Sequence, residues 1–255
     1  MIDSLFSALL MYSRIPVPQR QWNEKNMRFA LCFFPLVGTV IGVLVMGLRL
    51  ACDALHTGSL LFAAGTVAVI VLVTGGIHLD GFCDTCDARA SWGDRDKKLA
   101  ILSDPHIGAF AAIKLGAYLL LYTALLAQLT DVSAAAVASI GFVLSRSLSG
   151  LAAVSFRAAK KEGTLYSFTS SADKRTTVMV LSLVSLLCMA GMILIFPAAG
   201  ATASAAALLT LLYYRFMSYR EFGGVTGDLA GWFLQMCELF IAAAAALTYR
   251  ITEVM

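Results

Sequence analysis

Seven apolar stretches of about 20 residues each divide this chain, and each is long enough to cross a bilayer as a helix. Only 14% of the 255 residues are charged and 59% are hydrophobic, whereas a soluble domain carries about 25% charged residues. The chain therefore lacks the polar surface to cover itself in water. We predict an all-α, polytopic integral membrane protein with about seven transmembrane helices, as one membrane-embedded domain over residues 1–255. The stretches lie near residues 29–51, 59–79, 106–128, 133–155, 177–196, 198–217 and 229–249.

A shorter helix is predicted before the first of these stretches. Between residues 2 and 10, apolar side chains recur at helical spacing with polar residues between them. A segment of this length is expected to lie in the membrane interface rather than to cross the bilayer. The sequence IPVP at residues 15–18 then ends the helix, because proline removes a backbone donor and restricts the residue before it.

The basic residues predict an orientation. If the seven spans alternate, fifteen of the nineteen Lys and Arg residues fall on one side, only Arg49 and Arg250 fall on the other, and Lys114 and Arg146 lie inside spans. Cytoplasmic loops of membrane proteins carry the excess of basic residues. We therefore place the fifteen, together with the N-terminus, in the cytoplasm and the C-terminus on the opposite side. Nothing in this pattern predicts a nucleic-acid partner.

Three carboxylates follow the second span, in the segment GGIHLDGFCDTCDARAS at residues 75–91. Asp80, Asp84 and Asp87 are spaced so that a helix places them within about 60° of arc and about 10 Å of axis. Such a stripe repels itself and favours a hard cation, Mg²⁺ or Mn²⁺ rather than zinc. The alternative is a solvated acidic loop without a ligand.

The same segment holds a C-x-x-C pair, Cys83 and Cys86, near His78. A zinc or redox site is conceivable from this spacing. However, the sequence offers no second pair of thiols, and a helix would turn His78 away from the two cysteines. We interpret both cysteines as packing residues.

Asp104 opens the segment SDPHIGAF at residues 103–110. Aspartate followed by proline is a strong N-cap signal, so Asp104 is expected to begin a helix. A helix N-terminus at the membrane face also presents free N–H groups to an anion. Both interpretations stay open.

Charged residues inside the spans are the remaining candidates, because a charge in a bilayer is costly and usually functional. Lys114 lies near a span end and can extend to the interface, whereas Arg146 is deeper and suits a phosphate or an acidic partner. Glu238 lies about three turns into the last span, and one interpretation pairs it with Arg146. The sequence GGVTGDLAG at residues 223–231 places Asp228 at the cytoplasmic start of that span.

In these residues the sequence resembles the cobalamin synthase family, also called adenosylcobinamide-GDP ribazoletransferase. The resemblance covers nearly the whole length in five ordered blocks. The core block here ends in Ala88 where glycine is common, and His106 stands where a basic residue is usual. The blocks are SRIPVP (13–18), FFPLVGTVIG (33–42), HLDGFCDTCDA (78–88), ILSDPHIGAF (101–110) and GGVTGDLAG (223–231).

The resemblance implies a Mg²⁺-dependent enzyme of the bacterial cytoplasmic (inner) membrane. Such an enzyme joins adenosylcobinamide-GDP to α-ribazole or its 5′-phosphate and releases GMP. Carried over by position, Asp80, Asp84 and Asp87 are expected to be catalytic and, with Asp104, to bind the metal. Our candidate substrate-binding residues are His78, Arg146 and Asp228. The sequence leaves open whether the chain forms a homo-oligomer.

Two other functions fit part of this sequence. A CDP-alcohol phosphotransferase would carry Ala-Arg directly after D-G-x-x, but Ala88-Arg89 come four residues too late. A cation transporter would place its acidic site near the bilayer midplane, whereas the acids here gather at the predicted cytoplasmic face.

Overall fold

The computed structural model describes residues 1–19, 23–161 and 163–254. Arg20, one of the fifteen basic residues assigned to the cytoplasmic side, lies outside them. The structure is all-α, as predicted, with no β-strand among the described residues. Its helices are α1 (Ile2–Tyr12), α2 (Glu24–Met27), the 3₁₀-helix η1 (Ala30–Phe33), α3 (Phe34–Ala54), α4 (Ser59–Thr74), α5 (Ile77–Ala90), α6 (Arg95–Ile101), α7 (Ala109–Leu126), α8 (Val132–Ser155), α9 (Thr164–Ser171), α10 (Lys174–Ile195), α11 (Pro197–Glu221) and α12 (Gly227–Val254).

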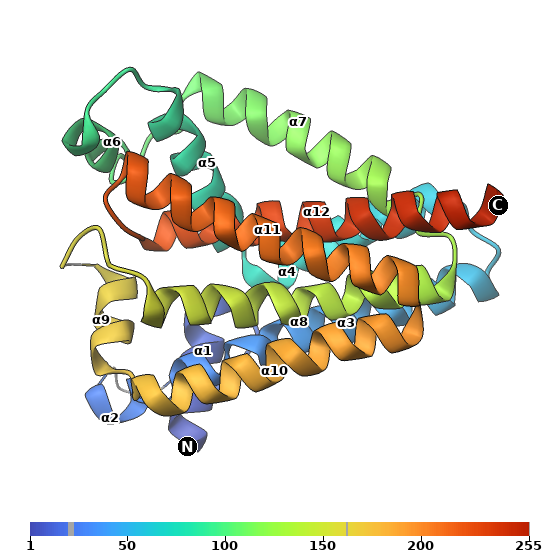
Figure 1. The fold of residues 1–255 in the computed structure, drawn as a ribbon, viewed down its shortest axis with the longest axis horizontal. Coiled ribbons are helices and arrows are strands. Elements are labelled where there is room, and N and C mark those ends of the chain that lie inside the picture. Colours follow the sequence, from blue (N-terminus) through green and yellow to red (C-terminus); the bar gives the residue numbers. More distant parts are fainter. Residues whose placement is uncertain (20–22, 162, 255) are drawn as a thin grey trace.

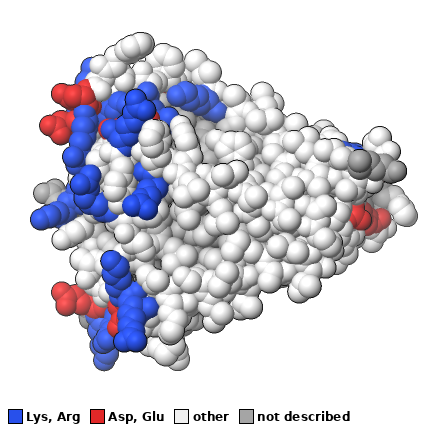
Figure 2. Space-filling view, in the orientation of Figure 1, with Lys and Arg blue, Asp and Glu red and all other residues white. Residues whose placement is uncertain are grey.

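The long helices form a bundle along the longest axis of the molecule (Figure 1). At one end lie α2, α6 and α9 with the first residues of α10 and α12, and the C-terminus lies at the other. Lys and Arg side chains gather over the first end, while few charges lie at the opposite end (Figure 2). We call the first the charged end. The one-sided distribution expected from the sequence is therefore present.

Five helices are long and apolar enough to cross a membrane, in the segments Glu24–Ala54, Ala109–Leu126, Val132–Ser155, Lys174–Ile195 and Gly227–Val254. The number rises to six if α4 and α5 together form one broken span. The sixth predicted stretch, 198–217, corresponds to α11, which brings the chain back between α10 and α12 (Figure 1). Helix α11 is not among the helices that are long and apolar enough to cross a membrane. A multi-pass helical membrane protein is confirmed, whereas the number seven stays a prediction.

The predicted second span, 59–79, is wrong after Thr74. Helix α4 ends at Thr74, and α5 starts at Ile77 with its axis turned by 96°. Gly75 and Gly76 make the turn with φ angles of 65° and 81°, a conformation that glycine adopts without the steric penalty of a Cβ atom. This pair separates an apolar helix from the helix that carries the acidic stripe.

Capping side chains set where other helices begin, and a glycine lets two of them pack closely. Asp131 and Asp173 accept hydrogen bonds from the first backbone amides of α8 and α10, as N-cap residues do. Hydrogen bonds from Thr176 and Arg28 lower the pKa of Asp173 to about 2. A Cβ atom on Gly38 of α3 would lie 2.2 Å from the carbonyl oxygen of Phe142 of α8, so these two helices touch backbone to backbone.

The N-terminal segment is helical, as predicted, and α1 packs against η1, α2 and α3. Its buried residues include Ser4, Ser7 and Ala8. Residues 13–19, which contain IPVP, form no helix. The position of α1 in a membrane interface stays a prediction.

Candidate active site

The three carboxylates of the predicted stripe all lie on one helix, α5, as expected. Asp80 is exposed in its first turn, while Asp84 and Asp87 are half-buried in the turns that follow. Helix α5 lies at the charged end of the bundle, beside α6 and α7 (Figure 1). The candidate site is therefore built on the helix that follows the Gly75-Gly76 turn.

Helix α5 crosses α12 at two glycines. A Cβ atom on Gly81 would lie 2.8 Å from both the Cα atom and the carbonyl oxygen of Asp228, and one on Gly231 would lie 3.0 Å from the carbonyl oxygen of His78. Because neither position has a side chain, the two backbones touch. This contact places Asp228, in the first turn of α12, next to the acids of α5.

Asp80, Asp84 and Asp228 form what we call the acidic cluster. Asp84 interacts electrostatically with Asp80 and Asp228, and also with Asp87 and Asp104. Within the described parts of the chain, no Lys or Arg forms an ion pair with a member of the cluster. Three carboxylates thus share one site without a paired cation, which is costly unless a cationic ligand joins them.

Asp87 has a different environment from the other two acids of α5. Its Oδ2 accepts a hydrogen bond from the Gly108 amide at 2.6 Å, and its Oδ1 accepts one from the Ala111 amide at 2.8 Å. These amides belong to the first turn of α7 and have no partner within that helix. A Cβ atom on Gly108 would lie 2.6 Å from the Asp87 oxygens. Asp87 therefore holds α7 against α5.

The expectation that Asp104 caps a helix is wrong. Helix α7 starts at Ala109 with Gly108 as its N-cap residue, because Asp87 supplies the acceptors that such a helix start requires. Asp104 lies in the preceding loop with its side chain 54% exposed, and it accepts hydrogen bonds from the backbone amide and the ring of His106. The His106 amide lowers the pKa of the Asp104 carboxyl.

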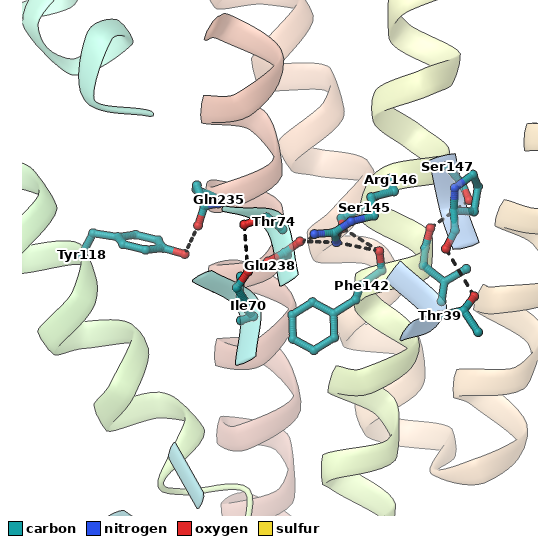
Figure 3. A network of polar contacts seen from close by, with 12 residues as sticks. Thr39, Ile70, Thr74, Tyr118, Phe142, Ser145, Arg146, Ser147, Gln235 and Glu238 are labelled. Atoms are coloured by element: carbon teal, nitrogen blue, oxygen red, sulfur yellow. Dashed lines mark hydrogen bonds and ion pairs between the residues drawn. The ribbon is translucent and has the colours of Figure 1, made fainter. Parts of the chain in front are cut away.

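Arg146 lies far from solvent and is paired with Glu238. Arg146 Nη1 donates to Glu238 Oε1 at 2.7 Å, and the side chains are 0% and 1% exposed. Figure 3 shows the two residues pointing toward each other from α8 and α12, with further hydrogen bonds to Ser145 and Phe142. Of the interpretations left open for Glu238, the structure has the pairing with Arg146. In this arrangement Arg146 presents no exposed surface to a substrate.

The two cysteines of α5, Cys83 and Cys86, are buried free thiols, in agreement with their interpretation as packing residues. His78 is also buried, and its Nε2 atom has no hydrogen-bond partner within the described residues. The described part of the chain contains no group of three or more His, Cys, Asp or Glu side chains arranged to hold a metal ion.

Two cavities meet at Asp228. The first, of about 210 Å³, lies among α1, α3, α5, α8 and α12, and we call it the apolar cavity because most of its walls are apolar. The second, of about 250 Å³, lies beneath α9, and we call it the polar cavity. Both are lined by Ala153, Leu165, Gly227 and Asp228. Asp80 lines the apolar cavity and a third, wider opening that includes Arg14.

Three residues beside the acids were not identified as site residues from the sequence. Tyr12 lines the apolar cavity, Lys160 lines the polar cavity and interacts electrostatically with Asp228, and Arg14 lines the third opening. Burial raises the pKa of the Tyr12 hydroxyl, which therefore stays protonated. The block SRIPVP, which begins directly after Tyr12, was the available signal for this region.

Together, the fold and the acidic cluster define a polytopic helical membrane protein with a carboxylate site at its charged end. Residues 4–246 match the cobalamin-5-phosphate synthase family, and the chain belongs to that family. It is 42% identical to an adenosylcobinamide-GDP ribazoletransferase of Lachnoclostridium phytofermentans, over 96% of this chain and 94% of that protein. Proteins with the same name from Chlorobium phaeovibrioides and Escherichia coli K12 are 32% and 30% identical, over 98% and 95% of this chain and 99% of each relative. No solved structure matches the chain.

Proposed function

We propose that this chain is an adenosylcobinamide-GDP ribazoletransferase, which completes cobalamin synthesis by joining adenosylcobinamide-GDP to α-ribazole or its 5′-phosphate. The similarity to curated relatives of that name along almost the whole chain carries the proposal. It favours this activity over a CDP-alcohol phosphotransferase or a cation transporter. Asp80 and Asp228 line cavities at the charged end of the bundle, which supports an enzyme site there.

In this reaction a ribose hydroxyl of α-ribazole attacks the phosphorus atom attached to cobinamide. The bond from that phosphorus to the bridging oxygen breaks, GMP leaves with the oxygen, and the hydroxyl proton must be accepted. Asp80 and Asp228 line the apolar cavity, so either carboxylate can accept the proton within the site. Lys160, in the adjoining polar cavity, offers positive charge to the phosphates.

The residues of the acidic cluster fit Mg²⁺. Carboxylate oxygens are the ligands that Mg²⁺ prefers, and the ion usually takes one or two carboxylates together with waters and substrate phosphates. A preformed group of three ligands is therefore not required. Asp80, Asp84 and Asp228 would hold the ion, with Asp104 near enough to interact with Asp84, and bound Mg²⁺ would neutralise the charge that develops on the pyrophosphate oxygens.

Asp87 would act differently from Asp80 and Asp84, which lie on the same helix. Since both of its oxygens accept hydrogen bonds from α7, we propose that Asp87 positions the helix rather than binding the cation. Arg146 would likewise stabilise the bundle through Glu238.

We further propose that the charged end faces the cytoplasm of a bacterial cytoplasmic membrane. The gathering of Lys and Arg at that end (Figure 2) supports this orientation. A reporter fused after residue 90 should then have cytoplasmic activity, and a periplasmic signal would reverse the proposed topology.

The experiment that tests the function uses purified full-length protein in nanodiscs. With adenosylcobinamide-GDP, α-ribazole and Mg²⁺, the protein should release GMP and form adenosylcobalamin in equal amounts. Leaving out α-ribazole should stop GMP release, which separates transfer from hydrolysis. Absence of the product with both substrates present would refute the proposal.

A further inference from the structure

The apolar cavity has the size and lining of a site for an aromatic group. Its walls include Tyr12 and Phe34, whose ring centroids are 4.2 Å apart, together with Leu165 and Leu234. A cavity on the order of 150 Å³ accepts benzene, so a cavity of about 210 Å³ has room for a fused pair of rings. It is far too small for a corrinoid macrocycle.

A polar group without a partner lies in the wall of this cavity. His78 is 5% exposed, lines the cavity, and its Nε2 atom has no hydrogen-bond partner within the described residues. A buried polar atom without a hydrogen-bond partner destabilises the protein. A ligand that brings a ring nitrogen to this atom would remove that destabilisation.

The position of the cavity relative to the acids fits the acceptor rather than the donor. Asp80 and Asp228 lie in its wall, and Asp228 also lines the polar cavity that contains Lys160. An aromatic base in the apolar cavity would therefore place its attached ribose beside these carboxylates. The phosphates of the other substrate would approach from the side of Lys160.

We propose that the apolar cavity, lined by Tyr12, Phe34, His78, Leu165 and Leu234, binds the benzimidazole base of α-ribazole, while the polar cavity receives the phosphates of the donor. The inference rests on the proposed function and adds a separate subsite for each substrate. Stacking on Tyr12 holds the base, and His78 Nε2 forms a hydrogen bond with the free ring nitrogen of the base.

Two tyrosines allow a matched test. Tyr12 lines only the apolar cavity of this pair and Tyr166 only the polar one, and both are half-buried. Tyr12→Ala should raise the Michaelis constant for α-ribazole by about tenfold, because base–aromatic stacking is lost, while the constant for adenosylcobinamide-GDP stays unchanged. Tyr166→Ala should leave the α-ribazole constant unchanged.

A second measurement guards against a merely damaged fold. Tyr12→Ala enlarges the cavity, so the variant should use the riboside of a bulkier tricyclic base better, relative to α-ribazole, than the wild type does. Structural damage would lower both rates together. Tyr12→Phe keeps the ring and should keep the α-ribazole constant.

The inference is overturned if Tyr12→Ala leaves the α-ribazole constant unchanged, raises the donor constant equally, or shows no change in base preference. These outcomes leave the wild-type reaction intact and so do not bear on the proposed function. Conversely, a wild type that releases no GMP refutes the function itself.

Discussion

The carboxylates of the acidic cluster at the charged end and the carboxylate in the middle of the bundle differ in whether they have an ion-pair partner. At the charged end, Asp80, Asp84 and Asp228 lie together beside cavities, without an ion-pair partner among the described residues. In the middle, Glu238 is 1% exposed and bound to Arg146 and Ser145. The same kind of side chain is thus left without a paired cation from the described residues in one region and paired with Arg146 in the other.

This difference distinguishes the carboxylates proposed to take part in the reaction from those that hold helices together. A buried charge that is already paired holds helices together, and removing its partner is costly. Carboxylates that share a site without a paired cation repel one another, and either a bound proton or a cation from outside relieves that repulsion. Asp87, which is on the same helix as Asp80 but bound to the α7 amides, belongs with the carboxylates that hold helices together.

The largest expected effect is on catalysis at the charged end. Asp84→Asn should lower GMP release by about a thousandfold or more, because the carboxylate charge that would hold the cation is lost. Membrane insertion and the thermal unfolding midpoint in detergent should not fall, since the substitution also relieves repulsion with Asp80 and Asp228. Normal turnover by this variant would remove Asp84 from the site.

The next effect is on stability in the middle of the bundle. Glu238→Ala should lower the free energy of unfolding by about 3–5 kcal/mol, because Arg146 is then buried without a counter-charge. The double variant Arg146→Met, Glu238→Met should recover most of that loss, and thermal unfolding in nanodiscs would measure both. If Glu238→Ala instead stops turnover without destabilising the protein, the contrast between the two regions fails.

A smaller effect is expected at the helix crossing that joins the acids. Gly81→Ala should cost about 1–3 kcal/mol, because its Cβ atom meets the backbone of Asp228 at 2.8 Å, and turnover should fall as Asp228 moves away from Asp80. Gly116→Ala in α7 is the control, since a Cβ atom there meets nothing within 4 Å. Equal behaviour of the two variants would argue against a close-packed crossing.

The smallest effect concerns Asp87. Asp87→Ala should lower stability by about 1 kcal/mol, the usual cost of losing a helix cap, and should reduce turnover much less than Asp84→Asn does. Parallel unfolding and GMP-release measurements would distinguish the roles. A loss of turnover as large as that of Asp84→Asn would return Asp87 to the metal site.

The sequence predicts most of the helices, because the length of an apolar stretch and the polar segments that interrupt it are local properties of the chain. It also places Asp80, Asp84 and Asp87 on one helix, since their spacing alone determines a shared face. What each carboxylate contacts is not local. The Asp87 bonds reach 21 and 24 residues along the chain, and Asp228 joins the cluster only through the α5–α12 crossing. The Asp104 prediction failed for the same reason, because a distant side chain caps α7.

The broken span shows the same limit. The apolar run over 59–79 was read as one span, although Gly75 and Gly76 within it could have marked the turn at which α4 ends. Conversely, the sequence offered the pairing of Arg146 with Glu238 as one interpretation, because two opposite charges in a bilayer have few other ways to avoid an isolated charge, but it left Arg146 equally open as a phosphate ligand.

The most direct test of the central claim is cation binding at the acidic cluster. Mn²⁺, a hard cation that accepts the same oxygen ligands as Mg²⁺, can be titrated into the nanodisc-embedded protein and followed by electron paramagnetic resonance without substrate turnover. Wild-type protein should bind Mn²⁺ in competition with Mg²⁺, Asp84→Asn should lose that binding, and Asp87→Ala should keep it. Wild-type binding that persists in Asp84→Asn, or no binding by the wild type even with adenosylcobinamide-GDP present, would contradict the account.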